Sequence, residues 1–294
     1  MPARPRVDVG VVTWNTADLT ADALRRLLDE DHGVDLRVLV RDNGSTDGTP
    51  ERLAERVPEA DVDAGGENLG FAAGVNTLLA RSTAPWFLAL NSDAWPRAGA
   101  IGRLVDAAAG RPRAAAVAPR LERPDGTLEH STHPFPSLGV AAVTAAGGDR
   151  WLPRPLADRL LLEPAWDHRR ARRVDWAVGA ALLLRREAVE DVGGLDERFF
   201  MYAEDLEWCH RAARGGWEVW FEPAAVVVHV GNASGRARPG TSGGCSRGTP
   251  GCGAPRSRPG PTRCRRAPPP PPARTTPPTR RAPPGGTTRG PRRT

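Results

Sequence analysis

The sequence predicts an α/β fold, an open and mostly parallel twisted sheet flanked by helices. Over residues 1–121, short apolar segments rich in β-branched residues alternate with segments whose apolar residues recur at helical spacing. The connections are short, and repeated β-α-β units with short connections form parallel sheets. Polar residues follow several of the expected strands. Because ligands bind at the carboxyl ends of the strands in such sheets, we expect the functional site there.

The first half of the chain alternates strands and helices. Val7–Trp14 is β-branched and apolar, as in a strand that is buried on both faces. Leu19–Leu28 places its apolar residues on one helical face. Pro50 suits the first turn of a helix. The expected strands of this half are 7–14, 34–40, 86–90 and 114–121, and the expected helices are 19–28, 50–57, 71–80 and 101–109.

The second half is less regular. Residues 122–173 carry scattered Pro, Trp and Arg residues without a clear period. Periodic sequence returns at Val174, and a helix that begins near Ala203 should stop at Gly215-Gly216, which is a good C-terminal signal. We expect a strand over 174–184, helices over 187–192 and 203–214, and two short strands over 218–221 and 225–230.

The end of the chain differs in composition. Residues 235–294 hold 14 Arg and 15 Pro but no acidic or aromatic residue, and the formal charge of +6 comes from this tail. Residues 1–234 hold 27 Arg against 35 acids, which disfavours a globular nucleic-acid binder. We therefore expect a folded domain over 1–234. The tail is expected to be disordered, or else to be an out-of-frame reading of a GC-rich gene.

Cysteine usage and apolar segments predict a cytoplasmic protein. Cys209 is alone among residues 1–234, and no two cysteines have metal-ligand or redox spacing. The N-terminus lacks an apolar stretch of signal-peptide length. The longest apolar run, 177–184, is too short to span a bilayer. We expect at most peripheral association with the inner face of the cell membrane.

Two polar segments in the first half are candidate ligand sites. Asp42 follows an expected strand and lies in the polar turn 41–48. This turn is either a helix-capping loop or the place where an acid hydrogen-bonds a nucleotide base or ribose. Segment 67–76 opens a helix with glycines and alanines, which let the backbone approach a ligand closely. It matches neither a phosphate-binding loop nor the three-glycine dinucleotide fingerprint.

Carboxylates mark two further places. Asp93 follows an expected strand, two residues after Asn91, where it is either a ligand for a hard divalent cation or part of an Asx turn. Glu204 and Asp205 follow the most aromatic stretch of the chain, where they are either first-turn acids favoured by the helix dipole or a general base. His229 ends the last expected strand, as a structural histidine or as a ligand.

Together these segments resemble the family-2 glycosyltransferases of the GT-A fold, above all the rhamnosyltransferase-like branch. The matches run in the family's order and cover nearly all of residues 7–234. They are VVTWNT (11–16), VRDNGSTDGT (40–49), ENLGFAAGVN (67–76), FLALNSD (87–93), VGAALLLRREAVEDVGGLDERFFMYAEDLEW (178–208), GWEVWFEP (216–223) and VVVHVGNAS (226–234). The resemblance implies a Rossmann-like GT-A sheet, with a nucleotide-binding half over 1–121 and an acceptor-binding and catalytic half over 122–234.

The resemblance also implies an activity. Family members transfer a sugar from a nucleoside diphosphate sugar to an acceptor hydroxyl, and this branch inverts the anomeric carbon. It implies dTDP-rhamnose or a UDP-sugar as donor, and a saccharide or lipid-linked saccharide as acceptor. The setting would be the synthesis of a cell-envelope polysaccharide or glycolipid, with Mg²⁺ or Mn²⁺ as cofactor and no nucleic-acid partner.

Residues of the donor site are implied by the same matches. Asp42 matches the acid that contacts the base of the donor, and Thr13 and Asn15 line the same end of the sheet. Asn68 and Asn76 match the loop beside the nucleoside.

The reacting end is implied in the same way. Asn91-Ser92-Asp93 stands where the family has its DXD-like motif, so Asp93 would bind the metal, and His229 matches a histidine that completes the metal site. Asp205 matches the catalytic base, with Glu204 beside it.

The sequence departs from the family in two places, and other functions remain open. Glu207 stands where the branch often has aspartate, and relatives usually continue beyond Ser234 with helical, basic and apolar sequence. One alternative is an inactive truncated paralogue that only binds nucleotide. Another is a sugar-1-phosphate nucleotidyltransferase, although VVTWNT lacks the glycines and basic residues that a triphosphate requires.

Overall fold

A computed structural model of the chain describes residues 3–145, 147, 153 and 168–231. All of them fall within one folded unit, Met1–Ser242. The expected tail over 235–294 and the expected domain boundary at residue 234 lie outside the described residues, as do residues 146, 148–152 and 154–167 of the irregular segment.

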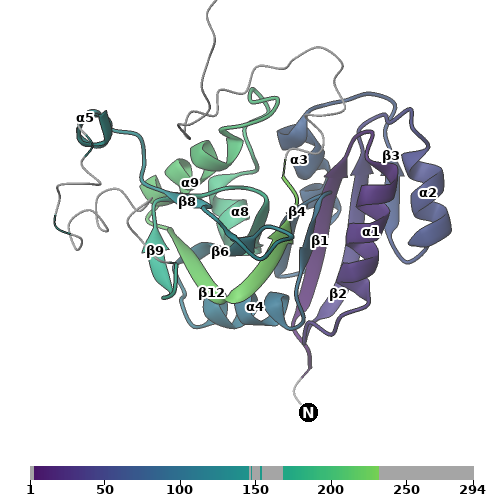
Figure 1. Cartoon of the computed structure of the whole chain (residues 1–294), viewed down its shortest axis with the longest axis horizontal. Helices are drawn as coiled ribbons and strands as arrows, with labels where there is room; N and C mark the ends of the chain where they lie inside the picture. The colour runs from purple at the N-terminus through teal and green to yellow at the C-terminus, as the bar shows by residue number, and fades with distance from the viewer. Residues whose placement is uncertain (1–2, 146, 148–152, 154–167, 232–294) are drawn as a thin grey trace, which may run out of the picture. The chain divides into compact units, whose positions relative to one another are not determined.

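The N-terminal half of the sheet is parallel, as expected (Figure 1). Its strands are β1 (Arg6–Thr13), β2 (Asp35–Asp42), β3 (Asp61–Ala64) and β4 (Trp86–Asn91). β1 lies between β2 and β4, and its register sets Thr13 opposite Asp42. These two residues therefore reach the same carboxyl edge of the sheet.

The other half of the sheet is mixed. The strand order is β3-β2-β1-β4-β11-β6-β12-β5, in which β11 is antiparallel to both of its neighbours and β12 is parallel to β6. β7 pairs with β6 and β9 with β12, while β8 and β10 form a separate pair. These strands are β5 (Ala94–Pro96), β6 (Ala114–Glu122), β7 (Leu128–Glu129), β8 (Thr132–His133), β9 (Arg172–Val174), β10 (Trp176–Ala177), β11 (Ala181–Arg185) and β12 (Glu218–His229).

Helices cover both faces of the sheet. The face whose core includes Leu27 and Leu104 is covered by α1 (Ala17–Leu28), α2 (Thr49–Arg56) and α4 (Ala100–Ala109). The opposite face is covered by α3 (Phe71–Arg81), α8 (Arg186–Val192) and α9 (Glu204–Arg214). A further short helix, α5 (Leu138–Ala145), follows β8. Among the described residues, no helix is both long and apolar enough to cross a membrane.

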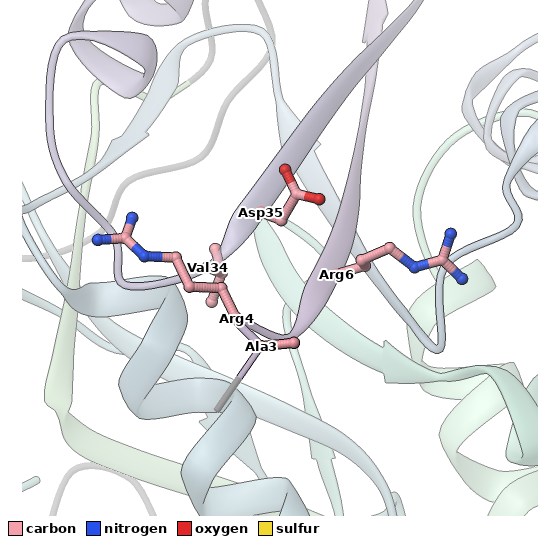
Figure 2. Close-up of a pocket in the computed structure, with 5 residues that line it drawn as sticks. All are labelled: Ala3, Arg4, Arg6, Val34 and Asp35. Carbon is pink, nitrogen blue, oxygen red and sulfur yellow. The ribbon is translucent and has the colours of Figure 1, made fainter. Parts of the chain in front are cut away.

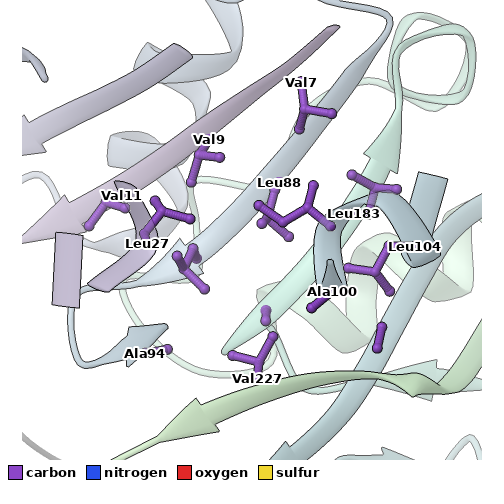
Figure 3. Close-up of a cluster of buried hydrophobic side chains, with 14 of the residues drawn as sticks. Val7, Val9, Val11, Leu27, Leu88, Ala94, Ala100, Leu104, Leu183 and Val227 are labelled. Atoms are coloured by element: carbon purple, nitrogen blue, oxygen red, sulfur yellow. The ribbon is translucent and has the colours of Figure 1, made fainter. Parts of the chain in front are cut away.

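The core follows the alternation of the strands (Figure 3). Val7, Val9 and Val11 of β1 all pack toward the α1 and α4 side, whereas Phe87 and Ala89 of β4 pack toward the α3 and α9 side. Successive strand residues point to opposite faces, so a segment that is apolar throughout contributes to both cores. Burying each large side chain stabilises the fold by about 1.5–3 kcal/mol.

The expected strand over 174–184 is wrong, because the chain changes partners within it. Val174 ends β9 on the main sheet, and β10 then pairs with β8. The carboxylate of Asp175 accepts a 2.8 Å hydrogen bond from the backbone of Phe135, and the Val178 N–H donates to the carbonyl of Ser131 at 2.8 Å. These contacts turn the chain before β11 begins at Ala181.

Other differences also arise from pairing. The two strands expected over 218–221 and 225–230 are one strand, β12, whose register shifts between Glu222 and Val226. Strands β3, β5, β7 and β8 were not expected, because segments of two to four residues carry no measurable period. β10 lies inside the strand expected over 174–184, and β9 overlaps it at Val174. The remaining expected helices and strands of the described residues are confirmed to within a few residues.

Candidate active site

The turn after β2 is held by its own side chains. Asp42 is 1% exposed, and its carboxylate accepts hydrogen bonds from both the backbone N–H and the hydroxyl of Ser45. Ser45 in turn accepts a 2.8 Å hydrogen bond from the Asn15 backbone, while the Asn15 side-chain oxygen accepts one of 2.8 Å from Thr46. Asn15 adopts a left-handed backbone at φ 52°, which asparagine tolerates better than most residues. Asp42 and Asn15 are thus brought together.

Thr13 lies beneath this turn. Its hydroxyl is 2.9 Å from both Thr16 and Thr20, and the residue is 1% exposed. Its carbonyl accepts a 2.9 Å hydrogen bond from the backbone of Asn43. The contacts of Thr13 therefore fix the ends of β1 and β2 relative to each other.

Asn68 lies in a neighbouring loop that joins this turn. Its side-chain oxygen accepts hydrogen bonds from the Gly70 backbone at 2.9 Å and from the Asn43 amide at 3.3 Å. Asn43 also donates to the carbonyl of Gly70 at 3.0 Å, and the Phe71 N–H donates to the carbonyl of Phe200 at 2.8 Å. The loop between β3 and α3 thus links the Asp42 turn to the segment before α9.

Asn76 is separate from the Asp42 turn. Its side chain exchanges two 2.8 Å hydrogen bonds with the backbone of Leu195 and donates a third, of 2.9 Å, to Glu197. The structure therefore brings Asn76 to the turn after α8 and not to Asp42.

Asn91, Asp93 and His229 come together where β4 and β12 end. The His229 Nε2 lies 3.3 Å from Asp93 Oδ1 and 3.3 Å from the Asn91 side-chain nitrogen. The Val230 N–H donates to the Asp93 carbonyl at 3.0 Å, which holds the two segments together. The Asp93 and His229 side chains are only 6% and 9% exposed, so their interaction is shielded from water.

Glu129 of β7 contacts the other nitrogen of the same imidazole. Its Oε2 lies 3.1 Å from the His229 Nδ1. Burial alone lowers the pKa of His229, but hydrogen bonds and charge interactions with Asp93 and Glu129 outweigh burial and raise that pKa to about 9. The protonated imidazole is thus stabilised between two carboxylates.

This cluster fits a divalent cation in kind. Asp93 offers a carboxylate oxygen, and His229 offers an imidazole nitrogen once a cation displaces the proton on Nε2. Mn²⁺ accepts both ligands, while Mg²⁺ prefers oxygen. Within the described ranges, no three His, Cys, Asp or Glu side chains form a metal-binding set. Cations that bridge substrate phosphates require only one or two protein carboxylates, and the phosphates and water complete the coordination.

Asp205 lies in the first turn of α9 and is linked to this cluster through backbone contacts. Its Oδ2 accepts a 2.8 Å hydrogen bond from the Gly179 N–H, and its Oδ1 accepts one of 2.7 Å from Leu206. The carbonyl of Ala180 accepts a 2.9 Å hydrogen bond from the backbone N–H of Asn91. Adjacent residues before β11 therefore join Asp205 to the end of β4.

Glu204 is more deeply buried than its neighbour Asp205. It is 5% exposed, and its Oε2 has no hydrogen-bond partner among the described residues. It lines a cavity of about 20 Å³ with Phe71, Leu184 and Trp208, which is room for one water molecule. Burial raises the pKa of Glu204 to about 7, opposed by a backbone hydrogen bond and assisted by the charge of Asp205.

The loop before α9 is strained and exposes apolar side chains. Tyr202 and Ala203 both adopt left-handed backbones, at φ 72° and 71°. Non-glycine residues in this region cost of order 1–3 kcal/mol and cluster at functional sites. Phe200, Met201 and Tyr202 are 48%, 40% and 71% exposed. An apolar loop thus lies directly before Glu204 and Asp205.

Comparison with known proteins decides the family. The protein-family model described as "Glycosyl transferase family 2" matches residues 8–193 of the sequence. The chain belongs to this family. It is 36% identical over 206 residues to the N-acetylglucosaminyl-diphospho-decaprenol L-rhamnosyltransferase of Mycobacterium tuberculosis (strain CDC 1551 / Oshkosh). That match covers 65% of this chain and 66% of the relative, so it spans just under two thirds of the relative's length.

Solved structures confirm the GT-A fold of this family-2 chain. A mannosyltransferase from Pyrobaculum calidifontis, in complex with GDP-Man and Mn²⁺, aligns with a TM-score of 0.54 and 24% identity, covering 78% of this chain and 58% of that one. GalNAc-T7 with UDP, GalNAc and Mn²⁺ aligns with a TM-score of 0.59 and 13% identity, covering 78% of this chain and 44% of that one. At these identities the likeness concerns the fold alone.

The predicted site residues of the chain form two separate groups, and one of the residues lies outside both. His229 contacts both Asn91 and Asp93, and Asp205 is joined to Asn91 through the backbone before β11. Thr13, Asn15, Asp42 and Asn68 belong to the β1 and β2 end. Asn76 belongs to neither group.

Three residues that contact the predicted site residues were not identified from the sequence. Ser45 and Gly179 lay inside matching segments, but their partners Asp42 and Asp205 became visible only in the structure. Glu129 lies in the irregular segment, on a strand of two residues, and no sequence signal marks it.

A wide hollow of about 570 Å³ lies away from the candidate active site (Figure 2). It is lined by residues at the start of β1 and β2, namely Ala3, Arg4, Arg6, Val34 and Asp35. β1 begins at Arg6 and ends at Thr13, so this hollow lies at the opposite edge of the sheet. Arg4 is paired there with Asp31 at 2.9 Å. None of the predicted site residues lines it.

Proposed function

We propose that the chain is an inverting glycosyltransferase that moves a sugar from a nucleoside diphosphate donor to an acceptor hydroxyl. The observation that carries the proposal is the link between Asp205 and the Asp93 cluster through Gly179, Ala180 and Asn91. An inverting displacement needs a base on the acceptor side and a cation on the leaving diphosphate, close to each other. The arrangement supports both parts.

Asp205 is the proposed base. The acceptor oxygen forms a bond to the anomeric carbon while the bond from that carbon to the diphosphate breaks, and the acceptor proton passes to Asp205. Each carboxylate oxygen of Asp205 accepts one backbone hydrogen bond and retains a further lone pair for this proton. The contacts to Gly179 and Leu206 hold the carboxylate in one orientation.

Glu204 is proposed to assist Asp205. Its side chain is buried and lines the water-sized cavity, which Asp205 also lines. Its proximity lets its charge state influence Asp205, without contact to substrate.

Asp93 and His229 are the proposed protein ligands of Mg²⁺ or Mn²⁺, with Asn91 beside them. When bound, the cation would neutralise charge on the leaving diphosphate. The side chains contribute a prearranged carboxylate and imidazole that lie 3.3 Å apart with little exposure to solvent.

The donor nucleoside is proposed to bind at the turn after β2, within a nucleotide-binding half over 1–121. Asp42, Asn15 and Asn68 would face the base and ribose, and Thr13 would act through the position of its strand. Asn76 would act through Leu195, in the acceptor and catalytic half over 122–234.

The donor sugar and the acceptor are proposed from the relative. The rhamnosyltransferase at 36% identity acts, by its name, on N-acetylglucosaminyl-diphospho-decaprenol. This supports dTDP-rhamnose, or else a UDP-sugar, as donor and a lipid-linked saccharide of the cell envelope as acceptor. A cytoplasmic protein at the inner face of the membrane would meet both.

Calorimetric titration of the full chain with dTDP, UDP and GDP, with and without Mn²⁺, tests the proposal. We expect Mn²⁺-dependent binding of one nucleotide, together with transfer from the corresponding sugar nucleotide. Binding of a sugar nucleotide without turnover on any saccharide acceptor would favour a paralogue that only binds nucleotide. No binding by a chain with an intact cooperative unfolding transition would contradict the proposed donor site.

A further inference from the structure

We propose that Glu129 is a positioning residue that orients the imidazole of His229 toward the cation of the donor diphosphate. The proposal rests on the proposed function, because it assigns a role within the same site. Nothing in the sequence marks Glu129, and its place follows from the tertiary structure alone.

Strand pairing brings Glu129 to His229. β7 pairs antiparallel with the end of β6, where Glu129 lies opposite Leu121. Leu121 also pairs with Val227 of β12, two residues before His229. The short strand β7 thus lies on one side of β6 and β12 on the other, and a glutamate side chain spans the remaining distance. The result is the 3.1 Å contact between Oε2 and Nδ1.

The contact determines which nitrogen faces the cluster. A carboxylate can only accept a hydrogen bond, so the Nδ1 that faces Glu129 carries a proton. The Nε2 then points to Asp93 and Asn91, each at 3.3 Å. A histidine that ligates a metal usually donates its other N–H to a carboxylate, which fixes the orientation and tautomer of the ring.

Burial makes this orientation specific. The Glu129 side chain is 22% exposed and that of His229 is 9% exposed, so water competes weakly for the contact. Without the carboxylate, a half-turn of the ring about its Cβ–Cγ bond puts Cδ2 in the place of Nδ1 and Cε1 in the place of Nε2. The Nε2 would then leave the position beside Asp93.

The test compares Mn²⁺ affinity and the state of the histidine ring among variants. Glu129→Ala removes the acceptor, and Glu129→Gln keeps an oxygen of the same reach without the charge. Glu122→Gln is the matched control, because Glu122 belongs to the same β6–β7 pairing, where it lies opposite Leu128. Its carboxylate pairs with Arg97 at 2.7 Å and Arg120 at 3.1 Å. Electron paramagnetic resonance with dTDP present measures the Mn²⁺ affinity.

We expect Glu129→Ala to weaken Mn²⁺ binding by about 10- to 100-fold. Glu129→Gln should recover part of the loss, and Glu122→Gln should stay within about twofold of the parent chain. Above the raised pKa of His229, ¹⁵N NMR of the metal-free chain should show the proton of the neutral imidazole on Nδ1, and the proportion of this tautomer should fall in Glu129→Ala. Thermal unfolding of each variant separates these effects from misfolding.

The outcomes separate the two proposals. Unchanged Mn²⁺ affinity in Glu129→Ala, when the parent chain binds Mn²⁺, overturns the role of Glu129 alone. A folded parent chain that binds no Mn²⁺ with any nucleotide overturns the proposed metal site as well. If Glu129→Ala does not fold, equal Mn²⁺ affinity and equal imidazole signals in Glu129→Gln and the parent contradict a role for the charge of Glu129.

Discussion

Asp205 accepts a 2.8 Å hydrogen bond from the backbone N–H of Gly179, on a segment whose next residue binds the backbone of Asn91. The first turn of α9 is therefore held against the end of β4, although no sequence proximity connects them. This relationship would let the proposed base on α9 and the proposed metal ligand after β4 act on the same substrate.

Asp205→Asn should abolish transfer while donor binding stays within about twofold. Asparagine keeps the size of the side chain and one acceptor oxygen, but it cannot take the acceptor proton. Turnover and nucleotide affinity of the same preparation measure the two effects. Asp196→Asn is the control, since that carboxylate pairs with Arg198 at 2.6 Å in the preceding loop. Full activity of Asp205→Asn would exclude it as the base.

Asp93→Asn should weaken Mn²⁺-dependent donor binding itself. The substitution removes the carboxylate that lies 3.3 Å from the His229 Nε2, and a neutral amide is a weaker ligand for a divalent cation. Calorimetry with and without Mn²⁺ separates metal-dependent from metal-independent affinity. An equal loss of binding in Asp93→Asn and Asp205→Asn would contradict the division of roles between them.

Asn76→Ala should lower stability more than nucleotide affinity. It leaves both backbone groups of Leu195 without their partner, which costs about 1–3 kcal/mol in the free energy of unfolding. Urea unfolding and nucleotide titration measure the two quantities. If Asn76→Ala loses nucleotide affinity as severely as Asp42→Asn while its stability is unchanged, then Asn76 contacts the donor directly.

Gly70→Ala should reduce transfer by perturbing the loop before α9. Gly70 has φ 85° and ψ 176°, a region that only glycine adopts readily, and a Cβ there would lie 2.5 Å from the Phe200 carbonyl oxygen. We expect a loss of about 1–3 kcal/mol in stability and a fall in kcat larger than the fall in nucleotide affinity. Gly66→Ala, where a Cβ meets nothing within 4 Å, is the control. Equal kcat in both variants would contradict the coupling.

Glu204 should make the chain less stable as pH rises. Its pKa is raised from 4.5 to about 7 in the folded chain, so the folded state binds the proton more tightly than the unfolded state does. The free energy of unfolding should therefore fall between about pH 4.5 and pH 7, and the lost contribution should be about 1–3 kcal/mol. Glu204→Gln stays neutral and should remove this part of the pH dependence. Urea unfolding at about pH 5 and pH 8 measures the difference, and parallel profiles of the two chains would refute the assignment.

Most of the helices and long strands could be predicted from the sequence, because the apolar patterns that mark them are local. β1 and β4 are long apolar segments, and helices α1, α3 and α4 repeat apolar residues at helical spacing. The chemistry-bearing residues at the strand ends could also be named, because Asp42 and Asp93 each follow such a segment directly.

Pairing between strands that are distant in the chain could not be predicted from the sequence. The break between Val174 and Ala181 depends on β8, and the register shift in β12 depends on β6. Neither partner is marked in the sequence of the segment itself. Asn76 illustrates the same limit for a side chain, since its spacing fits a ligand loop but its hydrogen bonds go to Leu195.

By itself the sequence determined the family, the order of the main strands and helices, and the residue types that end the strands. Only the tertiary structure decided which of those residues meet. It joined Asp93 to His229, supplied Glu129 as the second contact of the same ring, and linked Asp205 to Gly179. The physical reason is that periodicity and turn chemistry act over a few neighbouring residues, whereas a site is made by strand register and burial between segments far apart in the chain.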